Sequence, residues 1–239
     1  MTSHLTRTAT ALLAAVTMLS LFAGATLAAV GGPPNESFSF AERGLTAQAY
    51  WESCEGPDAS GVNRCESTQV YVFDGRQRSN DDLGHVNAAL TYLCVYHQQV
   101  AFGEDGMPIE PALIEQGCAD DPQLTVVDTL ASVTAAVSDL ELTETLCTYD
   151  PETGEPWCVD GDSRSVAVDV AFTGSGDVFA QRWTSKGQSL IDGVRCTFSS
   201  SGSGVSREAS ASMTLDGTAF AATFAQLSDG KTRFAQHCS

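Results

Sequence analysis

Hydrophobic and polar residues alternate with a period of two along much of this chain. Residues 209–215 alternate Ala, Ala, Met and Leu with Ser, Ser and Thr, and residues 37–40 alternate Ser with Phe. Residues 166–172 carry Val or Phe at every second position, and residues 133–142 follow the same rule with a change of phase after Val137. This period is typical of strands with one buried face, whereas helical periodicity is poor. The pattern predicts an all-β chain.

Asp-Gly pairs lie between the alternating segments. Asp and Gly supply the positive φ angles that tight hairpin turns require, so these pairs favour antiparallel hairpins. The strands and turns together predict an all-β architecture of about four or five strands in each half of the chain. The predicted turns are Asp74-Gly75, Asp105-Gly106, Asp192-Gly193, Asp216-Gly217 and Asp229-Gly230.

The chain contains 8 cysteines, and an even number in an exported protein argues for disulfides formed in an oxidising compartment. No C-x-x-C pair is present, and zinc ribbons and fingers need such short spacings, so a cysteine metal site is disfavoured. The residues are Cys54, Cys65, Cys94, Cys118, Cys147, Cys158, Cys196 and Cys238.

The cysteine spacing indicates an internal duplication. Cys54 and Cys65 are eleven residues apart, and so are Cys147 and Cys158, with a polar, turn-rich segment inside each interval. A β-like stretch and two further cysteines then follow in the same order in each half. Such self-similarity at a fixed distance is the sequence signature of a repeated structural unit.

The duplication divides the mature chain into two disulfide-stapled units. We place the first β repeat unit at residues 37–120 and the second at residues 121–239. Their antiparallel hairpins would form two small β-sandwiches, or one combined sandwich or barrel. Each short disulfide would stabilise the fold by roughly 2–3 kcal/mol. The most local pairing within the units is Cys54–Cys65, Cys94–Cys118, Cys147–Cys158 and Cys196–Cys238.

The N-terminus has the pattern of a secretory signal peptide. A short polar region precedes an apolar run from Ala11 to Ala23, and small residues then fit an A-x-A cleavage pattern. Polar residues dilute the run, which argues against the alternative of a membrane anchor. We expect residues 1–29 to be removed by cleavage between positions 25 and 29, and residues 30–36 to form a flexible mature N-terminus. The product would be secreted to the extracellular space or periplasm, without membrane insertion.

Acidic residues greatly outnumber basic ones. The 239 residues include 30 Asp and Glu against 12 Lys and Arg, which gives a formal charge of −18, and 43% are hydrophobic. This composition is too apolar for a disordered acidic tail. The negative field repels phosphates, so the sequence argues against nucleic acid or anionic lipid as a partner. The tight basic cluster Arg76-Gln77-Arg78 is too small to reverse this expectation.

Signatures of catalysis are missing from the sequence. There is no G-x-S-x-G nucleophile elbow and no H-E-x-x-H motif. His85, His97 and His237 are interpreted as surface histidines, because nothing in the pattern pairs them with a nucleophile. Paired carboxylates for glycoside hydrolysis carry almost no specificity here, since acids occur in nearly every loop.

Three aromatic residues are candidates for a carbohydrate platform. Tyr149 and Trp157 lie at the second disulfide hairpin, between Cys147 and Cys158, and Trp51 precedes Cys54. Packing of these rings in the core or against the disulfides is the competing interpretation.

Two acidic clusters are candidate calcium ligands, because hard cations take carboxylate and carbonyl oxygens from loops. They contain Asp81 and Asp82 in one case, and Asp160 and Asp162 in the other. Neither completes the D-x-[DN]-x-[DN]-G loop, so solvated acidic turns are the competing interpretation. No other cofactor is expected.

These observations favour a secreted, non-enzymatic β-protein that serves in binding, adhesion or cell-surface structure, with a cell-surface glycan or protein as its partner. Linked duplicated sites would raise avidity through effective concentration. Two alternatives remain: a secreted hydrolase that uses loop carboxylates, and a secreted protease inhibitor that presents the braced loop from Thr148 to Trp157.

Overall fold

The computed structural model describes residues 37–81, 84–104, 106–128, 130–149, 156–191 and 194–238, so the expected signal peptide and residues 30–36 lie outside the described residues. Every regular element within these ranges is a β-strand, which confirms the predicted all-β class. None of the described segments forms a helix of the length and hydropathy needed to cross a bilayer. The strands are β1 (Ser37–Glu55), β2 (Asn63–Asp81), β3 (Gly84–Phe102), β4 (Ala112–Asp120), β5 (Gln123–Val127), β6 (Ser132–Tyr149), β7 (Pro156–Ile191), β8 (Val194–Leu215), β9 (Thr218–Ala221) and β10 (Phe224–Cys238).

The strand pairs are all antiparallel and belong to one sheet. The order is β10-β1-β2-β3-β4-β6-β7-β8-β9, with β5 paired to β6. β8 also pairs with β10, so the pairings that start at β10 return to it. Strands from both predicted repeat units therefore belong to one sheet. The duplication itself, and the division into units 37–120 and 121–239, stay predictions.

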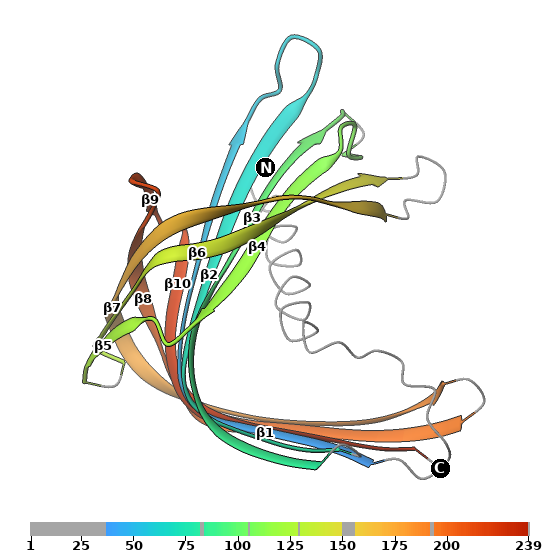
Figure 1. Ribbon diagram of the computed structural model, residues 1–239, viewed down its shortest axis with the longest axis vertical. Helices are drawn as coiled ribbons and strands as arrows, with labels where there is room; N and C mark the ends of the chain where they lie inside the picture. Colours follow the sequence, from blue (N-terminus) through green and yellow to red (C-terminus); the bar gives the residue numbers. More distant parts are fainter. Residues whose placement is uncertain are drawn as a thin grey trace, which may run out of the picture.

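The longest strands bend, which gives the molecule a C-shaped outline with two arms (Figure 1). One arm contains the hydrophobic core, and we call it the lobe. The other is a single layer of six strand segments in the order β7-β8-β10-β1-β2-β3, and we call it the distal sheet. Its segments are residues 181–191, 194–204, 230–238, 37–44, 75–81 and 84–90.

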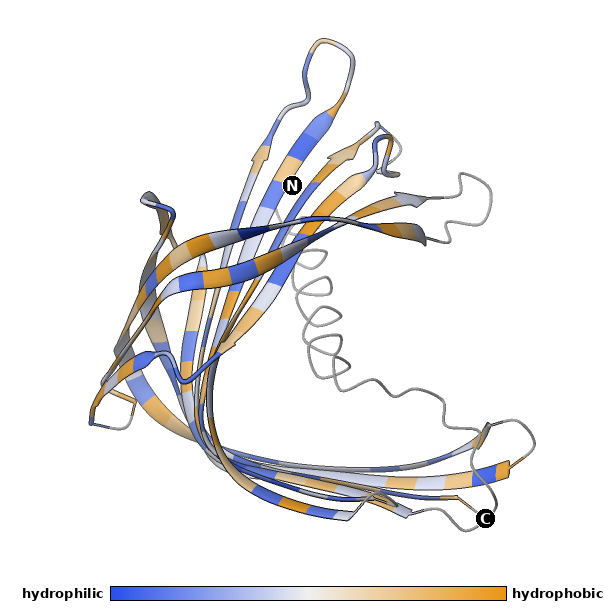
Figure 2. Cartoon of the chain, in the orientation of Figure 1, coloured by the Kyte–Doolittle hydropathy of each residue, from blue (hydrophilic) through white to orange (hydrophobic). Residues whose placement is uncertain are grey.

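The core of the lobe uses the alternating positions that the sequence marks as apolar. Hydrophobic and hydrophilic residues alternate along the strands (Figure 2), and every second side chain points into the lobe. Fully buried side chains come from β1, β2, β3, β6, β7, β8 and β10. The core therefore lies between parts of the same sheet that face each other. Examples are Ala47, Val72, Leu93, Leu142, Phe172, Met213 and Leu227.

The change of phase in residues 133–142 is a β-bulge. Val137 pairs with Val168 and Leu140 pairs with Val166, so β6 uses one residue more than β7 between the two pairs. The extra residue lets Leu140 point to the same side as the apolar residues before it, and both Val133 and Leu140 are buried in the core.

A row of glycines marks the bend. Gly44 lies opposite both Gly75 and Gly230, and Gly230 lies opposite Gly204. A Cβ atom at Gly44 would overlap the carbonyl oxygen of Asp74, and one at Gly204 would overlap that of Asp229. Because only glycine lacks this atom, the backbones can approach closely enough at this row for the sheet to bend.

This row corrects two predicted turns. Asp74-Gly75 and Asp229-Gly230 lie within β2 and β10, where each pairs with residues on both sides. The Asp-Gly pairs correctly indicated positions where the backbone requires glycine. The reason for the requirement is the bend within the strands and not a turn between them. Asp216-Gly217 is a true turn between β8 and β9, with φ angles of 48° and 77°. Gly106 also has a positive φ, in the connection after β3, whereas Asp105 and Asp192-Gly193 lie outside the described residues.

The four disulfides follow the local pairing predicted from the spacing: Cys54–Cys65, Cys94–Cys118, Cys147–Cys158 and Cys196–Cys238. Each joins residues directly opposite one another on neighbouring strands, with Cα atoms 4.0 to 4.1 Å apart. They therefore fix the register of four strand pairs covalently. Four such bonds indicate an oxidising environment.

Candidate binding surface

Eight of the 12 lysines and arginines of the chain lie on the distal sheet, and all eight are on one face of it. The register explains this, because odd-numbered residues of β1, β8 and β10 share a face with even-numbered residues of β2 and β7. We call this face the basic face. Its cations are Arg43, Arg76, Arg78, Arg182, Lys186, Arg195, Lys231 and Arg233, and all are exposed.

The cations form rows across the strands. Arg43 pairs with both Arg76 and Lys231, so three cations lie on adjacent strands at one level. Ser203 then separates Lys231 from Arg182 in the same row. Like charges directly opposite each other destabilise a sheet, typically by a few tenths of a kcal/mol up to about 1 kcal/mol per pair. This row therefore lowers stability, which points to a role other than folding.

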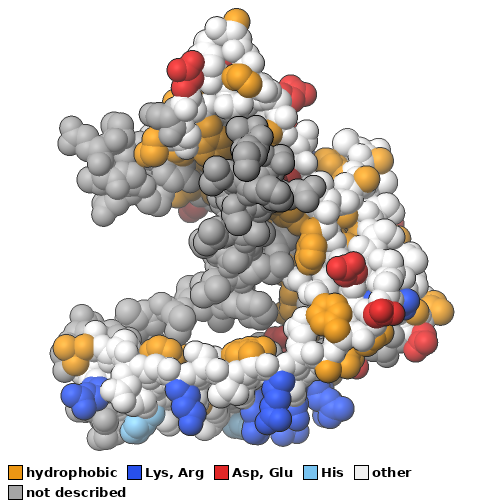
Figure 3. All heavy atoms as spheres, turned by 180° about the vertical axis from the view of Figure 1, so that it is seen from behind, with side chains coloured by type: hydrophobic (Ala, Val, Ile, Leu, Met, Phe, Trp, Pro, Cys, Tyr) orange, Lys and Arg blue, Asp and Glu red, His pale blue; other side chains and the backbone are white. Residues whose placement is uncertain are grey.

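No described carboxylate forms an ion pair with the basic face, and the acids nearest to it along the strands are Asp74 and Asp229, which lie on the same face two residues before Arg76 and Lys231. None of the ion pairs among the described residues involves any of the eight cations. The distal segments contain two acidic residues, Glu42 and Asp81; Glu42 lies on the opposite face, and Asp81 is at the end of β2. Figure 3 shows the cations gathered along the outer side of this arm, whereas acidic side chains lie on the lobe.

The residues between the cations are small and polar. Ser39, Asn80, Thr184, Ser199 and Ser201 belong to this group, and His85 and His237 also lie on this face. Apart from the exposed Leu190, the described side chains here include no large hydrophobic group and no Phe, Tyr or Trp. The basic face therefore offers mainly charge and hydrogen bonds.

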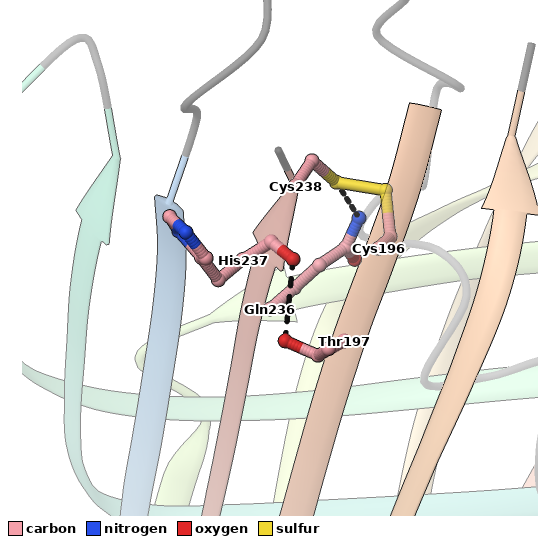
Figure 4. The surroundings of a disulfide bond; sticks show 5 residues. All are labelled: Cys196, Thr197, Gln236, His237 and Cys238. Carbon is pink, nitrogen blue, oxygen red and sulfur yellow. Dashed lines mark hydrogen bonds between the residues drawn. A yellow bond between two sulfur atoms is a disulfide. The ribbon is translucent and has the colours of Figure 1, made fainter. Parts of the chain in front are cut away.

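The opposite face of the distal sheet carries a group of Phe side chains. Phe38 and Phe234 pack with ring centroids 6.1 Å apart, and Phe40 and Phe198 lie on the same side. The Cys196–Cys238 disulfide closes the far end on this face, with Gln236 Nε2 donating to Cys238 Sγ at 3.3 Å, and His237 extends away from it (Figure 4). One layer of strands thus separates the basic face from a face that carries these Phe side chains.

Trp51 does not join Trp157 in the predicted aromatic platform. Trp51 is only 4% exposed and packs in the core, with its ring centroid 6.5 Å from that of Phe220. No face of its indole is left for a ligand at the surface, so packing explains this residue. Trp157 is 71% exposed on the lobe, opposite Thr148. Tyr149 is at the end of β6, opposite Pro156.

The candidate calcium ligands do not converge among the residues that the structure describes. Asp160 and Asp162 are exposed in β7, beside a register shift opposite Thr143 and Thr145, so they lie in a strand and not in a turn. Asp82 lies outside the described residues. No group of three or more His, Cys, Asp or Glu residues is arranged to hold a metal within the described ranges.

His97 is buried, so its interpretation as a surface histidine was wrong. Its Nδ1 lies 2.9 Å from Thr68 Oγ1, and its Nε2 lies 3.7 Å from Glu66 Oε1. Burial lowers the pKa of His97. Thr68 is only 1% exposed, so a substrate cannot reach its hydroxyl, and the arrangement does not form an accessible nucleophile and base.

Beside His97, the nearly buried Glu115 is paired with a cation. Arg164 Nη2 donates to Glu115 Oε2 at 2.9 Å, and a second bond from Arg164 Nε makes the contact bidentate. These hydrogen bonds lower the pKa of Glu115. The pair is a structural contact between β7 and β4. The hydrolase alternative stays untested, and so does the inhibitor alternative, because residues 150–155 of its loop lie outside the described residues.

Sequence reasoning missed the basic face because its cations come from five strands. Along the chain, only Arg76 with Arg78 and Lys231 with Arg233 are close together, each at a spacing of two. In a strand, this spacing places both side chains on one face. The repeated spacing was the available signal, but it does not reveal that the two strands are separated only by β1.

No protein-family model matches this chain, and a search of curated proteins finds no similar one. The functional argument therefore depends on the distal sheet itself.

Proposed function

We propose that this chain is an exported, non-enzymatic binding protein that attaches through its basic face to acidic polysaccharides at a cell surface or in the surrounding matrix. The observation that carries this proposal is the set of eight exposed cations on one face, none of which forms an ion pair with a carboxylate of the described residues. Export is supported by the N-terminal signal pattern and by the four disulfides.

A polysaccharide fits this surface better than other polyanions do. Single-stranded nucleic acid is usually held by aromatic stacking, and double-stranded DNA by an element that enters a groove. The basic face is formed by a single sheet and carries no described Phe, Tyr or Trp ring. Peripheral membrane binding uses apolar side chains beside the cations, whereas here the apolar residues lie on the reverse of the sheet. Hydroxyl and amide groups between the cations suit an extended, hydroxylated polyanion.

The charge distribution also directs how the polymer approaches. The acidic lobe repels a polyanion, whereas the basic face attracts it, so productive contact is confined to one side of the molecule. Exposed charges more than about 8–10 Å apart are screened at physiological ionic strength, so binding should weaken steeply as salt is added.

The direct test is retention of the mature protein on immobilised dextran sulfate and polygalacturonate, with uncharged dextran as control. We expect retention on both acidic polymers and none on dextran, and elution at moderate salt. The triple variant Arg43→Ser/Arg76→Ser/Lys231→Ser should elute at markedly lower salt.

Matched single variants separate a local site from general charge. Lys231→Ser and Arg64→Ser change the net charge equally, but Arg64 lies on the lobe and pairs with Glu110. Lys231→Ser should weaken retention, whereas Arg64→Ser should not. Equal effects, or unchanged retention of the triple variant, would contradict the proposal. Tighter binding to an oligonucleotide or to anionic vesicles at the same salt concentration would assign the face to another class of polyanion.

A further inference from the structure

A hollow of about 120 Å³ lies at the bend, on the face of the sheet opposite the cations. Its floor is the glycine row, with Gly44, Gly230 and Gly204 on three adjacent strands. Because these residues have no side chains, a ligand in the hollow can approach the backbone directly.

Polar side chains stand on both sides of the glycine floor. Thr46, Ser228 and Ser206 form one cross-strand row on the side of the lobe. Glu42 and Thr232 are opposite one another in the next row, on the side of the distal sheet. The side chains on this face of the hollow supply four hydroxyl groups, the Glu42 carboxylate and the Gln181 amide, a mixed set of hydrogen-bond donors and acceptors, and Asp229 and Lys231 also line the hollow from the other face of β10.

The indole of Trp183 lies at the end of the cross-strand row that contains Glu42 and Thr232. Trp183 lies opposite Gly202, and a Cβ atom on that glycine would overlap the indole, so the ring lies across the bare backbone. The side chain is still 45% exposed. An indole held in this way presents a flat apolar surface next to the polar groups.

Glu42 lacks the partner that a half-buried carboxylate usually has. None of the described ion pairs includes it, and burial raises its pKa. The bend also brings it within electrostatic range of the phenols of Tyr71 and Tyr92. A ligand that donates hydrogen bonds to Glu42 would stabilise its charged form, which burial disfavours.

We propose that this hollow, which we call the bend site, binds a neutral sugar ring whose apolar face rests on Trp183 and whose hydroxyls meet Glu42, Thr46 and Thr232. The volume equals that of about four water molecules, which suits one ring edge and not an oligosaccharide. A bare ammonium ion would satisfy the carboxylate alone, whereas a sugar can use both the donors and the acceptors. The bend site is on the reverse of the basic face, so it does not depend on the proposed polysaccharide binding.

The test is titration of the folded mature protein with methyl glycosides of glucose, galactose, mannose and N-acetylglucosamine, followed by tryptophan fluorescence and calorimetry. At least one glycoside should give a saturable change. Trp183→Ala should weaken its binding at least tenfold, and Glu42→Gln, which keeps the shape of the side chain, should weaken it several-fold. Trp157→Ala is the matched control, since Trp157 is exposed on the lobe, and it should leave the affinity unchanged.

Further variants keep the outcomes distinct. If Trp183→Ala does not fold, as judged by circular dichroism, then Glu42→Gln decides. Arg76→Ser/Arg78→Ser should reduce retention on dextran sulfate and leave glycoside binding intact, so the two sites fail separately. No saturable change with any glycoside, an equal loss in Trp157→Ala, or tighter binding of methylammonium than of each glycoside would overturn the proposal.

Discussion

Arg43 lies directly opposite Arg76 on the neighbouring strand, and the next opposed pair toward the lobe is Gly44 with Gly75. A repulsive pair and a bend thus occupy consecutive positions of the same two strands. The glycines allow the sheet to turn away from the lobe, and the arginines then face solvent on its outer side. The bend and the basic face are therefore parts of one arrangement.

Charge reversal at this position should separate stability from binding. Arg43→Glu replaces two like-charge pairs, with Arg76 and Lys231, by two opposite-charge pairs. We expect the free energy of unfolding to rise by up to about 1 kcal/mol, because cross-strand pairs have energies of this size. Retention on dextran sulfate should fall at the same time. Urea denaturation and salt elution measure the two effects.

Arg64→Glu is the control for that reversal, because it places a second acid beside Glu110 in the lobe. It should not raise the midpoint of urea unfolding. If Arg43→Glu leaves the protein less stable than the wild type, repulsion does not operate in the row of cations.

Gly44→Ala should disturb the bend. Its Cβ atom would overlap the carbonyl oxygen of Asp74 and the Cα atom of Gly75, both of which are backbone atoms that cannot rotate away. Forced overlap of this kind costs about 1–3 kcal/mol. For a domain of this size, that corresponds to a fall in melting temperature of roughly 2–12 °C.

The matched control is Ser39→Ala in the same strand, at an exposed position of the basic face. Exposed substitutions of this kind stay within about 0.5 kcal/mol of the wild type. Equal melting temperatures for Gly44→Ala and Ser39→Ala would show that the row of glycines is not required for the bend.

The sequence predicted those features that depend on neighbours along the chain. Period-two alternation identified the strands, and the phase change after Val137 marked a bulge opposite Val166 and Val168. The eleven-residue cysteine intervals correspond to disulfides across two hairpins. In each case the cause is local, since a strand's alternation and a hairpin's length are set within a few residues.

The features that sequence reasoning missed depend on register between distant strands. Nothing near Arg43 shows that Lys231 will be its neighbour, because 188 residues separate them and only the β1–β10 pairing joins them. The glycine of Asp74-Gly75 signals a backbone requirement, but a turn and a bend share that signal. The burial of His97 likewise arises from contacts with β2 and β4, on either side of its own strand.

Burial of His97 predicts a dependence of stability on pH. Its pKa in the folded protein is lowered from 6.5, mainly by burial. As the pH falls below about 6.5, the unfolded chain binds a proton that the folded chain resists, so the free energy of unfolding should decrease. The decrease attributable to His97 ends once the pH is below its folded pKa. Urea denaturation between pH 7.5 and about pH 5 measures this slope.

His97→Asn should flatten that slope, because it removes the group whose protonation differs between the two states. His85→Asn serves as the control, since His85 is exposed on the basic face. An unchanged slope in His97→Asn, or an equal change in both variants, would show that other groups set the dependence on pH.

The disulfides should differ in how much they stabilise the fold. Cys196–Cys238 closes an interval of 42 residues, whereas Cys54–Cys65 closes one of 11. A longer loop removes more entropy from the unfolded chain, so the chain-entropy model gives about 4 kcal/mol for the first bond and about 3 kcal/mol for the second. The variant Cys196→Ala/Cys238→Ala should therefore unfold at lower urea than Cys54→Ala/Cys65→Ala. The reverse order would mean that contacts of the sulfur atoms in the folded state, and not loop entropy, dominate.

The two disulfides should also differ in their effect on binding. Cys196–Cys238 joins β8 to β10 at the far end of the distal sheet, so its loss should loosen the basic face and reduce retention on dextran sulfate. Loss of Cys54–Cys65, which lies in the lobe, should leave retention unchanged.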